Sequence, residues 1–320
     1  MAKKLFKLSG SEMFAHLASL FLPSKVMKNK RFFRYWESKG YHVTPNHFYE
    51  PIPDTNTLKN DIWEKNTELV GIEMRELEQI RLLDEFSMKF KREYDLLPLQ
   101  KHHDMKPYDY FINNTGFGSV DGEILYCMIR RFKPKRIFEI GSGNSTYLSA
   151  KAVLKNKEEE ENYQCELVAI EPHPNDTLRA GFPGLSRVIP SKVQDIPLSE
   201  FKKLTENDIL FIDSSHVLKI GSDVQYEYLE ILPRLNKGVI VHLHDIFLPE
   251  EYPKEWVLEK FIFWTEQYVL QAFLTFNDRF EVMWAGRYIH VKHPDKLEFS
   301  FRSYKQGEGS PGSFWIRKMR

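Results

Sequence analysis

Two short segments carry acidic and histidine side chains at a spacing that suits proton transfer or cation binding. Asp213 and His216 lie in the segment FIDSSH, and His244 and Asp245 lie in the segment VHLHD. Each aspartate follows an apolar run that predicts a β-strand. An imidazole titrates near neutral pH, so His216 or His244 could act as the catalytic base for a hydroxyl group, with Asp213 or Asp223 orienting His216. The alternative for either histidine is a structural hydrogen bond to a loop.

The same residues could bind a divalent cation. Asp213 and Asp245 offer carboxylate oxygens, which suit a hard cation such as Mg²⁺. If His216 and His244 join them, the mixed set suits a transition metal better than magnesium. The two aspartates are therefore candidate metal ligands.

A glycine-rich turn follows another apolar strand. In the segment 136–146, RIFEIGSGNST, Gly141 and Gly143 let the backbone turn sharply and leave space for a ligand against the main chain. Ser145 and Thr146 can cap the next helix, whose free N–H groups would face the bound molecule. The segment predicts a site for a nucleoside-bearing cofactor.

The spacing of this turn does not fit a dinucleotide site. Such a site has the pattern G-x-G-x-x-G and an acidic residue about 20 positions further on. Thr146 stands at the third glycine position, and the acid that ends the next strand, Glu171, comes later than that spacing predicts. The carboxylate of Glu171 still suits the two hydroxyls of a ribose.

Helices and strands alternate from Asp121 onward. This alternation implies a parallel sheet with helices on both faces, and ligands bind such sheets beyond the carboxyl ends of the strands. The predicted helices are 121–131, 145–155, 222–232 and 254–274, and the predicted strands are 136–140, 166–171, 186–189, 208–213, 238–243, 280–284 and 313–317.

Acids at the ends of three predicted strands, Glu139, Glu171 and Asp213, form a set that resembles class I S-adenosylmethionine-dependent methyltransferases. The resemblance covers about residues 105–320 and includes the segments AIEPHP, DILFIDSSHV, GVIVHLHDIFLPEEYP and WTEQYVLQAFL. It implies an α/β fold, a Rossmann-like, doubly wound, mostly parallel sheet of seven strands with helices on both faces and an N-terminal helical extension. It also implies S-adenosylmethionine as the cofactor, and it does not supply the methyl acceptor.

The resemblance assigns residues to parts of the cofactor. Glu171 would contact the ribose, and Asp195 would lie near the adenine unless it caps a helix. Asp213 would lie beside the sulfonium. The remaining contacts, around the amino-acid part and the helix start, would be Glu139, Gly141, Ser142, Gly143, Ser145 and Thr146.

The metal prediction gains support from one branch of the family. The chain is similar to metal-dependent O-methyltransferases of catechols and macrolide sugars, in which acids at the ends of the two strands that carry Asp213 and Asp245 here bind magnesium. This chain departs from that pattern, because Ile246 stands where those enzymes offer a third oxygen ligand.

The segment after Asp245 predicts the acceptor side of the site. Aromatic and polar side chains there suit a sugar ring or another hydroxylated ligand, although their helical spacing also fits a buried face. The candidate substrate contacts are Tyr252, Trp256, Glu266 and Tyr268. We expect O-methylation of a hydroxylated small molecule, with a saccharide or glycoconjugate favoured. The alternatives are N-methylation of a small amine or peptide, and a cofactor-binding or hydroxylase relative on the same fold.

Composition limits the partners. Lys and Arg number 45, and Asp and Glu also number 45, so no overall field attracts nucleic acid and we expect a small-molecule partner. We expect Cys127 and Cys165 to be reduced thiols in the core, and their spacing does not fit a zinc site of cysteine ligands. No apolar stretch has the length of a membrane span, so we expect a cytoplasmic protein without an integral membrane segment.

The first 104 residues predict a helical and extended region, with the methyltransferase domain at 105–320. We expect helix over 1–40, an extended proline-rich piece over 44–54, and a long helix over 73–97 with Leu77, Ile80 and Leu83 on its buried face. This region could serve as a lid or as a homodimer interface. Its basic first 40 residues fit a solvated helical face or, alternatively, a helix resting on a membrane surface.

Overall fold

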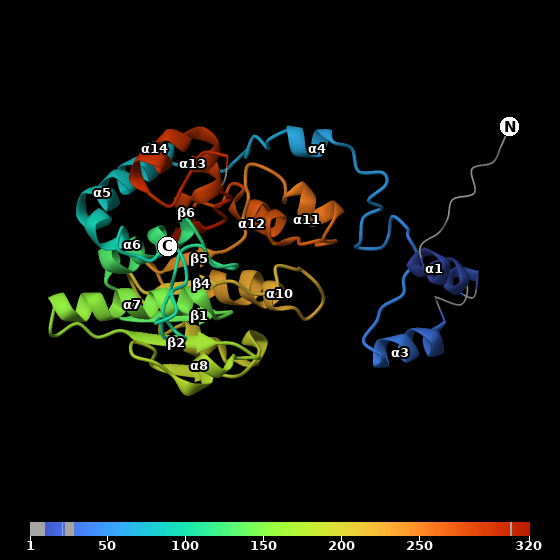
Figure 1. Cartoon of the computed structure of the whole chain (residues 1–320), viewed down its shortest axis with the longest axis horizontal. Helices are drawn as coiled ribbons and strands as arrows, with labels where there is room; N and C mark the ends of the chain where they lie inside the picture. The colour runs from blue at the N-terminus through green and yellow to red at the C-terminus, as the bar shows by residue number, and fades with distance from the viewer. Residues whose placement is uncertain (1–9, 21, 23–28, 308) are drawn as a thin grey trace. The chain divides into compact units, whose positions relative to one another are not determined.

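The computed structural model describes residues 10–20, 22, 29–307 and 309–320. The chain forms two compact units, Met1–Asn60 and Asp61–Arg320, and the larger unit contains the sheet (Figure 1). The unit boundary therefore differs from the expected boundary at residue 104. The reason is that helix α5 (Glu76–Tyr94) buries Leu83, Phe86 and Phe90 in the core of the larger unit.

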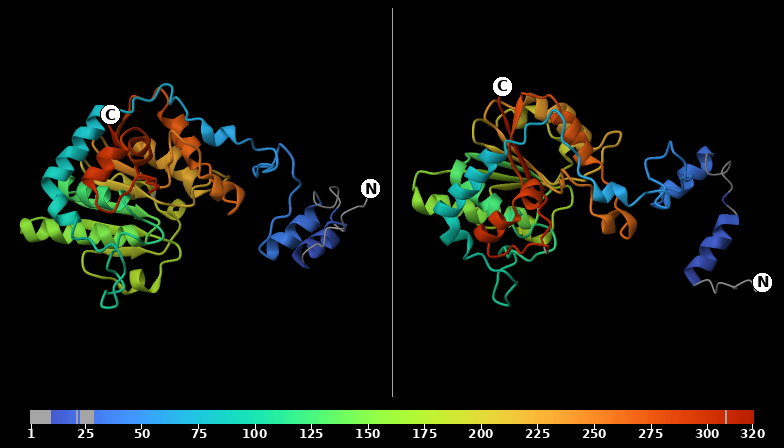
Figure 2. Two further views of the ribbon diagram at one scale, coloured as in Figure 1. Left: turned by 45° about the horizontal axis from the view of Figure 1, so that its top comes forward. Right: turned by 90° about the horizontal axis from the view of Figure 1, so that it is seen from above.

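The larger unit is built on a seven-stranded sheet with the order β3-β2-β1-β4-β5-β7-β6 (Figures 1 and 2). Strands β1 to β5 pair in parallel, and β7 runs antiparallel to both β5 and β6. The predicted fold, mostly parallel and Rossmann-like, is confirmed. The strands are β1 (Arg136–Ile140), β2 (Glu166–Ile170), β3 (Arg187–Ile189), β4 (Ile209–Ile212), β5 (Ile240–Leu243), β6 (Phe280–Ala285) and β7 (Phe314–Lys318).

The three central strands end level with one another. Ile140 of β1 is paired with Ile212 of β4, and Ile212 is paired with Leu243 of β5. Because parallel strands share their carboxyl edge, the residues that follow them leave the sheet at one rim. The residues that leave the sheet there are Gly141 after β1, Asp213 after β4 and His244 after β5. Strands β4 and β5 are neighbours, as expected.

Each face of the sheet packs on its own apolar core. In β4, Ile209 and Phe211 point to the core under α5, α6 (Asp121–Phe132) and α7 (Asn144–Glu159). Leu210 and Ile212 point to the opposite core, under α9 (Leu198–Phe201), α10 (Asp223–Tyr226) and α12 (Glu266–Leu274). This alternation is the period of two of a strand buried on both sides.

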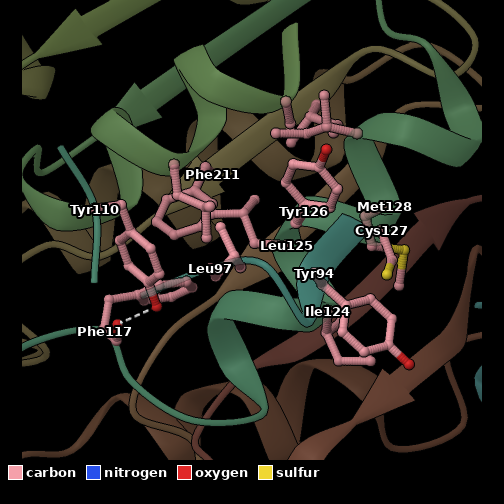
Figure 3. Close-up of a cluster of buried hydrophobic side chains, with 14 of the residues drawn as sticks. Tyr94, Leu97, Tyr110, Phe117, Ile124, Leu125, Tyr126, Cys127, Met128 and Phe211 are labelled. Carbon is pink, nitrogen blue, oxygen red and sulfur yellow. Dashed lines mark hydrogen bonds between the residues drawn. The ribbon is translucent and has the colours of Figure 1, made fainter. Parts of the chain in front are cut away.

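Figure 3 shows part of the first core, where aromatic rings from several elements meet around Phe211. Tyr94, Phe117 and Tyr126 are buried there, and the Tyr110 hydroxyl donates a hydrogen bond of 2.8 Å to the Phe117 carbonyl. Full burial of a large apolar side chain contributes about 1.5–3 kcal/mol. This core holds α6, and the loop 112–119 that precedes it, against the sheet.

Two predicted helices differ in the structure. The helix expected over 222–232 is α10 followed by a π-helical turn (Glu227–Ile231) and a 3₁₀ turn (Leu232–Arg234). The helix expected over 254–274 is two helices, α11 (Lys254–Leu258) and α12. Helix α12 begins where the His216 carbonyl accepts hydrogen bonds from the backbone of Thr265 and Glu266, a long-range contact that local spacing cannot reveal.

Smaller differences concern short or edge elements. Leu77 was expected on the buried face of α5 but is exposed, because Gln79, Leu83, Phe86, Phe90 and Tyr94 form that face and Leu77 lies on the opposite side of the helix. The sequence pattern also missed α4 (Asp61–Glu64), α8 (Asp176–Ala180), α13 (Gly286–Lys292) and α14 (Pro294–Ser300). Helix α14 packs against α5 (Figure 1).

The N-terminal unit contains α1 (Gly10–Leu20) and α3 (Lys30–Ser38). The extended segment 44–54 has no helix or strand, as predicted. The helix expected over 1–40 lies partly outside the described residues, at 1–9, 21 and 23–28. None of the described helices combines the length and the apolarity needed to cross a bilayer.

Candidate functional site

A cavity of about 410 Å³ lies at the carboxyl ends of β1, β2 and β4. Gly141, Glu171 and Asp213 all line it, so the glycine turn and the acids after β2 and β4 meet in one place. Its other lining residues are Ile140, Ile170, Pro172, Lys192, Val193, Gln194, Ser214, Ser215, Lys219, Gly221, Ser222 and Asp223. The cavity is open to solvent and its walls mix apolar and polar side chains, as a nucleoside requires.

The two glycines of the turn have different roles. Gly141 has φ +76°, and a Cβ at this position would lie 1.8 Å from the Asp213 carbonyl oxygen. Close approach of the chain leaving β1 to the chain leaving β4 therefore requires glycine. A Cβ at Gly143 would meet no atom within 4 Å. Gly143 instead leaves open space at the N-terminus of α7.

Glu139 lies buried behind this turn. Its Oε1 accepts hydrogen bonds from the hydroxyls of Ser145 and Thr146, so these two side chains hold the carboxylate. Its Oε2 and the Ser142 hydroxyl oxygen have no protein partner among the described residues. Burial raises the pKa of Glu139 to about 8. Neither Glu139 nor Ser142 lines the cavity, although Ile140 and Gly141 between them do. Leaving a buried oxygen unpaired costs free energy, so a ligand that reached these two oxygens would be stabilised by them.

Next to the cavity, two aspartates and two histidines form a tight cluster. His216 Nε2 lies 3.2 Å from Asp213 Oδ1 and 3.6 Å from Asp245 Oδ2. His244 Nδ1 lies 3.4 Å and 3.5 Å from the same two oxygens. The sequence predicted all four residues as candidates, and the structure brings them together at the ends of β4 and β5.

A third carboxylate holds His216 from the other side. Glu266 Oε2 lies 2.8 Å from His216 Nδ1, and the Tyr228 hydroxyl donates to Glu266 Oε1 at 3.1 Å. Glu266 is fully buried and lines neither cavity, so its predicted role as a substrate contact stays a prediction. It directs His216 Nε2 toward Asp213 and Asp245.

The backbone of the cluster is strained. His216 and Asp245 have φ values of 59° and 55°, in the left-handed region that side chains rarely adopt. Such a residue costs about 1–3 kcal/mol, and the surrounding structure must hold it in place. Gly312 packs closely against Asp245, because a Cβ at Gly312 would lie 3.1 Å from the Asp245 Cα.

The carboxylates control the protonation of the histidines. Burial alone would lower the pKa of His216, but its hydrogen bonds to Asp213 and Glu266 raise that pKa to about 10. Burial would also lower the pKa of His244. The negative charges of Asp245 and Asp213 outweigh this effect, so the pKa of His244 lies well above its usual value. The carboxylates therefore favour the doubly protonated, positively charged form of both imidazoles in this arrangement. A protonated imidazole cannot accept a further proton, which argues against either as a simple general base.

The same geometry suits a cation. Asp213, His216 and Asp245 each offer one ligand atom, and these atoms lie within 4.8 Å of one another. His216 would supply the third ligand that Ile246, a buried apolar residue, cannot offer. Metal-bound histidines commonly donate their second N–H to a carboxylate, as His216 Nδ1 can to Glu266.

A second cavity, of about 520 Å³, opens on the other side of the cluster. Asp121, His244 and Asp245 line it together with Trp256 and Trp264. The remaining wall comes from Lys260, Ile262, Phe247, Gly309, Ser310 and the loop residues Ile112, Asn113, Asn114, Thr115, Gly116, Gly118 and Ser119. Two indole rings facing amide and hydroxyl groups suit a ligand with both an apolar face and polar edges.

Asp121 ties this cavity to the chain after α14. Its two carboxylate oxygens accept hydrogen bonds from the backbone N–H groups of Gly312 and Ser313, and it lies 3.7 Å from His244 Nε2. The sequence did not reveal the loop 112–119, although its Asn and Gly residues indicate a turn. Asn114 joins this loop to the α7 N-terminus through a 3.0 Å hydrogen bond with Asn144.

Three more of the predicted contacts, Asp195, Tyr252 and Tyr268, line neither cavity. Asp195 is exposed, while Val193 and Gln194 beside it line the cofactor-sized cavity. Tyr252 is buried, and its hydroxyl accepts a hydrogen bond from the Gln267 N–H. The Tyr268 hydroxyl donates to Glu251 on the surface. Of the predicted substrate contacts, Trp256 alone lines the second cavity.

Comparison with known proteins agrees with this arrangement. Residues 138–246 match the family model described as a methyltransferase domain. An uncharacterized protein of Archaeoglobus fulgidus is 33% identical over 177 residues, which are 53% of this chain and 77% of that protein.

Two solved structures align loosely. An O-methyltransferase from Bacillus cereus in complex with SAH has 14% identity and a TM-score of 0.34, covering 74% of this chain and 90% of that one. A putative protein-L-isoaspartate O-methyltransferase from Plasmodium falciparum, in complex with S-adenosyl-L-homocysteine, has 14% identity and a TM-score of 0.29, covering 54% and 85%. Neither alignment is close enough to carry an argument about function. The family match and the relative, together with the strand order, are sufficient: the chain belongs to the class I S-adenosylmethionine-dependent methyltransferases.

Proposed function

We propose that this protein transfers a methyl group from S-adenosylmethionine to an oxygen atom of a hydroxylated small molecule, with a saccharide or glycoconjugate favoured. The observation that carries the proposal is the position of the acid and histidine cluster. Asp213 lines the cofactor-sized cavity, and His244 and Asp245 line the second cavity. A cofactor in the first and an acceptor in the second would meet at this cluster, and such positioning can contribute about 7–11 kcal/mol to catalysis.

The first cavity fits S-adenosylmethionine. The Glu171 carboxylate would accept hydrogen bonds from the ribose hydroxyls. The unpaired oxygens of Glu139 and Ser142 suit the ammonium end of the amino-acid part. The open space at Gly143 leaves the α7 N–H groups accessible to its carboxylate.

The cluster supplies what methyl transfer to oxygen needs. The reaction forms a C–O bond, breaks the C–S bond of the sulfonium and releases the proton of the acceptor hydroxyl. A divalent cation held by Asp213, His216 and Asp245 would lower the pKa of a hydroxyl bound to it. Two carboxylates and an imidazole suit a transition-metal dication better than Mg²⁺. Glu266 orients His216, and Trp256 and Trp264 would pack against the acceptor ring.

The test is product analysis with a methyl-labelled cofactor. The protein is incubated with labelled S-adenosylmethionine and either glycosides bearing free hydroxyls or small amines, and the products are read by mass spectrometry. We expect the label on a glycoside oxygen, loss of turnover after chelation, and recovery on adding Mn²⁺. Label on amines alone would contradict O-methylation. A cytoplasmic location and a homodimer stay predictions.

A further inference from the structure

The N-terminal unit exposes apolar side chains that it does not bury itself. Among the described residues of 10–60, none is buried, although aromatic residues are frequent. The large exposed apolar residues there are Met13, Phe14, Leu17, Leu20, Phe33, Tyr35, Tyr41, Phe48, Tyr49 and Ile52. Exposed apolar surface gathered in one segment marks an interaction site.

Helix α1 gathers its apolar residues along one side. Met13, Phe14, Leu17 and Leu20 are between 52% and 74% exposed. Their spacing places them on one arc of the helix, while Ala15 and Ser19 lie on the opposite arc. A helix with an uncovered apolar arc of this width is built to lie against an apolar layer.

Helix α3 places aromatic and basic residues on opposite sides. Phe32, Phe33, Tyr35 and Trp36 share one side, and the other side carries Lys30, Arg31 and Arg34. No described residue of α3 is buried. The placement of rings and cations on opposite sides of α3 distinguishes between two classes of partner. Single-stranded nucleic acid would need the rings and the cations in one groove, whereas a helix in a bilayer interface has cations opposite Trp and Phe.

The charge of the unit matches an anionic surface. Residues 1–60 contain ten Lys and Arg against four Asp and Glu, a net charge of +6. The other 260 residues then contain 35 against 41, a net charge of −6. The neutral total therefore hides a basic unit attached to an acidic one, and only the basic unit would be drawn to a negative surface.

We propose that α1 and α3 dock the protein on an anionic membrane surface. The apolar arc of α1 and the aromatic side of α3 enter the boundary between headgroups and acyl chains, and Lys30, Arg31 and Arg34 face the lipid phosphates. The helices lie on the bilayer, because none of those described could cross it. The proposal does not depend on the methyl acceptor.

The experiment is sedimentation of the full chain with vesicles of phosphatidylcholine alone or mixed with an equal amount of phosphatidylglycerol. We expect binding to the mixed vesicles that weakens with salt. Each cation near the surface contributes about a fivefold factor, so the triple variant Lys30→Gln/Arg31→Gln/Arg34→Gln should bind on the order of 100-fold more weakly. Lys157→Gln/Lys202→Gln/Lys237→Gln removes the same charge from exposed positions of the other unit and should bind like the parent.

A second pair of variants tests the apolar arc. Phe14→Glu/Leu17→Glu should abolish binding, and Ala15→Gln on the opposite arc should leave it unchanged. Circular dichroism and S-adenosylhomocysteine binding confirm that each variant is folded. Equal binding to both kinds of vesicle, or equal binding by the variants and their controls, would overturn the proposal. So would a shift of these variants from dimer to monomer without any vesicle binding by the parent, because a second copy would then cover the face.

Discussion

Replacing Gly141 and Gly143 by alanine, one at a time, separates the fold of the glycine turn from its proposed ligand. At Gly141 the new Cβ would lie 1.8 Å from the Asp213 carbonyl oxygen, where an ordinary contact is at least 3.4 Å. At Gly143 it would enter open space. The two variants add the same methyl group two residues apart, so each is the control for the other.

The expected magnitudes differ in kind. Gly141→Ala pays for a left-handed backbone, about 1–2 kcal/mol, and also displaces the chain after β4. We expect a loss of about 3 kcal/mol or more, which lowers the Tm of a domain of this size by roughly 6–12 °C. Gly143→Ala should change stability by less than about 0.5 kcal/mol. Its methyl group would occupy cofactor space and weaken S-adenosylhomocysteine binding at least about tenfold, or 1.4 kcal/mol.

Differential scanning calorimetry measures the first effect and titration calorimetry the second. A Gly141→Ala protein as stable as the parent would refute the close approach of β1 and β4 at this turn. A Gly143→Ala protein that binds S-adenosylhomocysteine as tightly as the parent would refute the cofactor position.

Three further predictions concern the carboxylates. Glu266→Gln keeps a hydrogen-bond acceptor for His216 but removes the negative charge. The affinity for Mn²⁺, measured by calorimetry, should therefore fall about 10- to 100-fold with the fold unchanged. Unchanged affinity would show that Glu266 does not position His216 for a metal ion. Asp245→Asn should abolish Mn²⁺ binding, and parent turnover that survives chelation would exclude the cation altogether. Burial raises the pKa of Glu123 from 4.5 to about 7, so the folded state binds this proton more tightly than the unfolded state. The resulting stability is present below about pH 4.5 and lost as the pH rises to about 7, and urea titrations should show this decline in the parent but not in Glu123→Gln. Parallel profiles would contradict it.

The sheet and its rim could be predicted because their signals are local. β1 spans 136–140 as predicted, since a β-prone run ends at a glycine turn. The acids that follow β2 and β4 mark the carboxyl ends of those strands. Their meeting in one cavity follows from the parallel register, which the alternation of helices and strands implies.

The acceptor side could not be predicted in the same way. Glu266 is one acid at the start of a helix, and only its contact with His216, 50 positions away in sequence, reveals its role. Spacing suggested one helix over 254–274, but the His216 carbonyl sets the start of α12. The raised pKa of His216 was also beyond the sequence, because it depends on Asp213 and on Glu266, which lies 50 positions away.

The most direct test of the account is titration calorimetry of the parent and of Glu171→Ala with S-adenosylhomocysteine. The account predicts saturable binding by the parent and binding at least about tenfold weaker in the variant, because Glu171 would contact the ribose in the cavity shared with Gly141 and Asp213. No binding by the parent, or equal binding by both proteins, would contradict it.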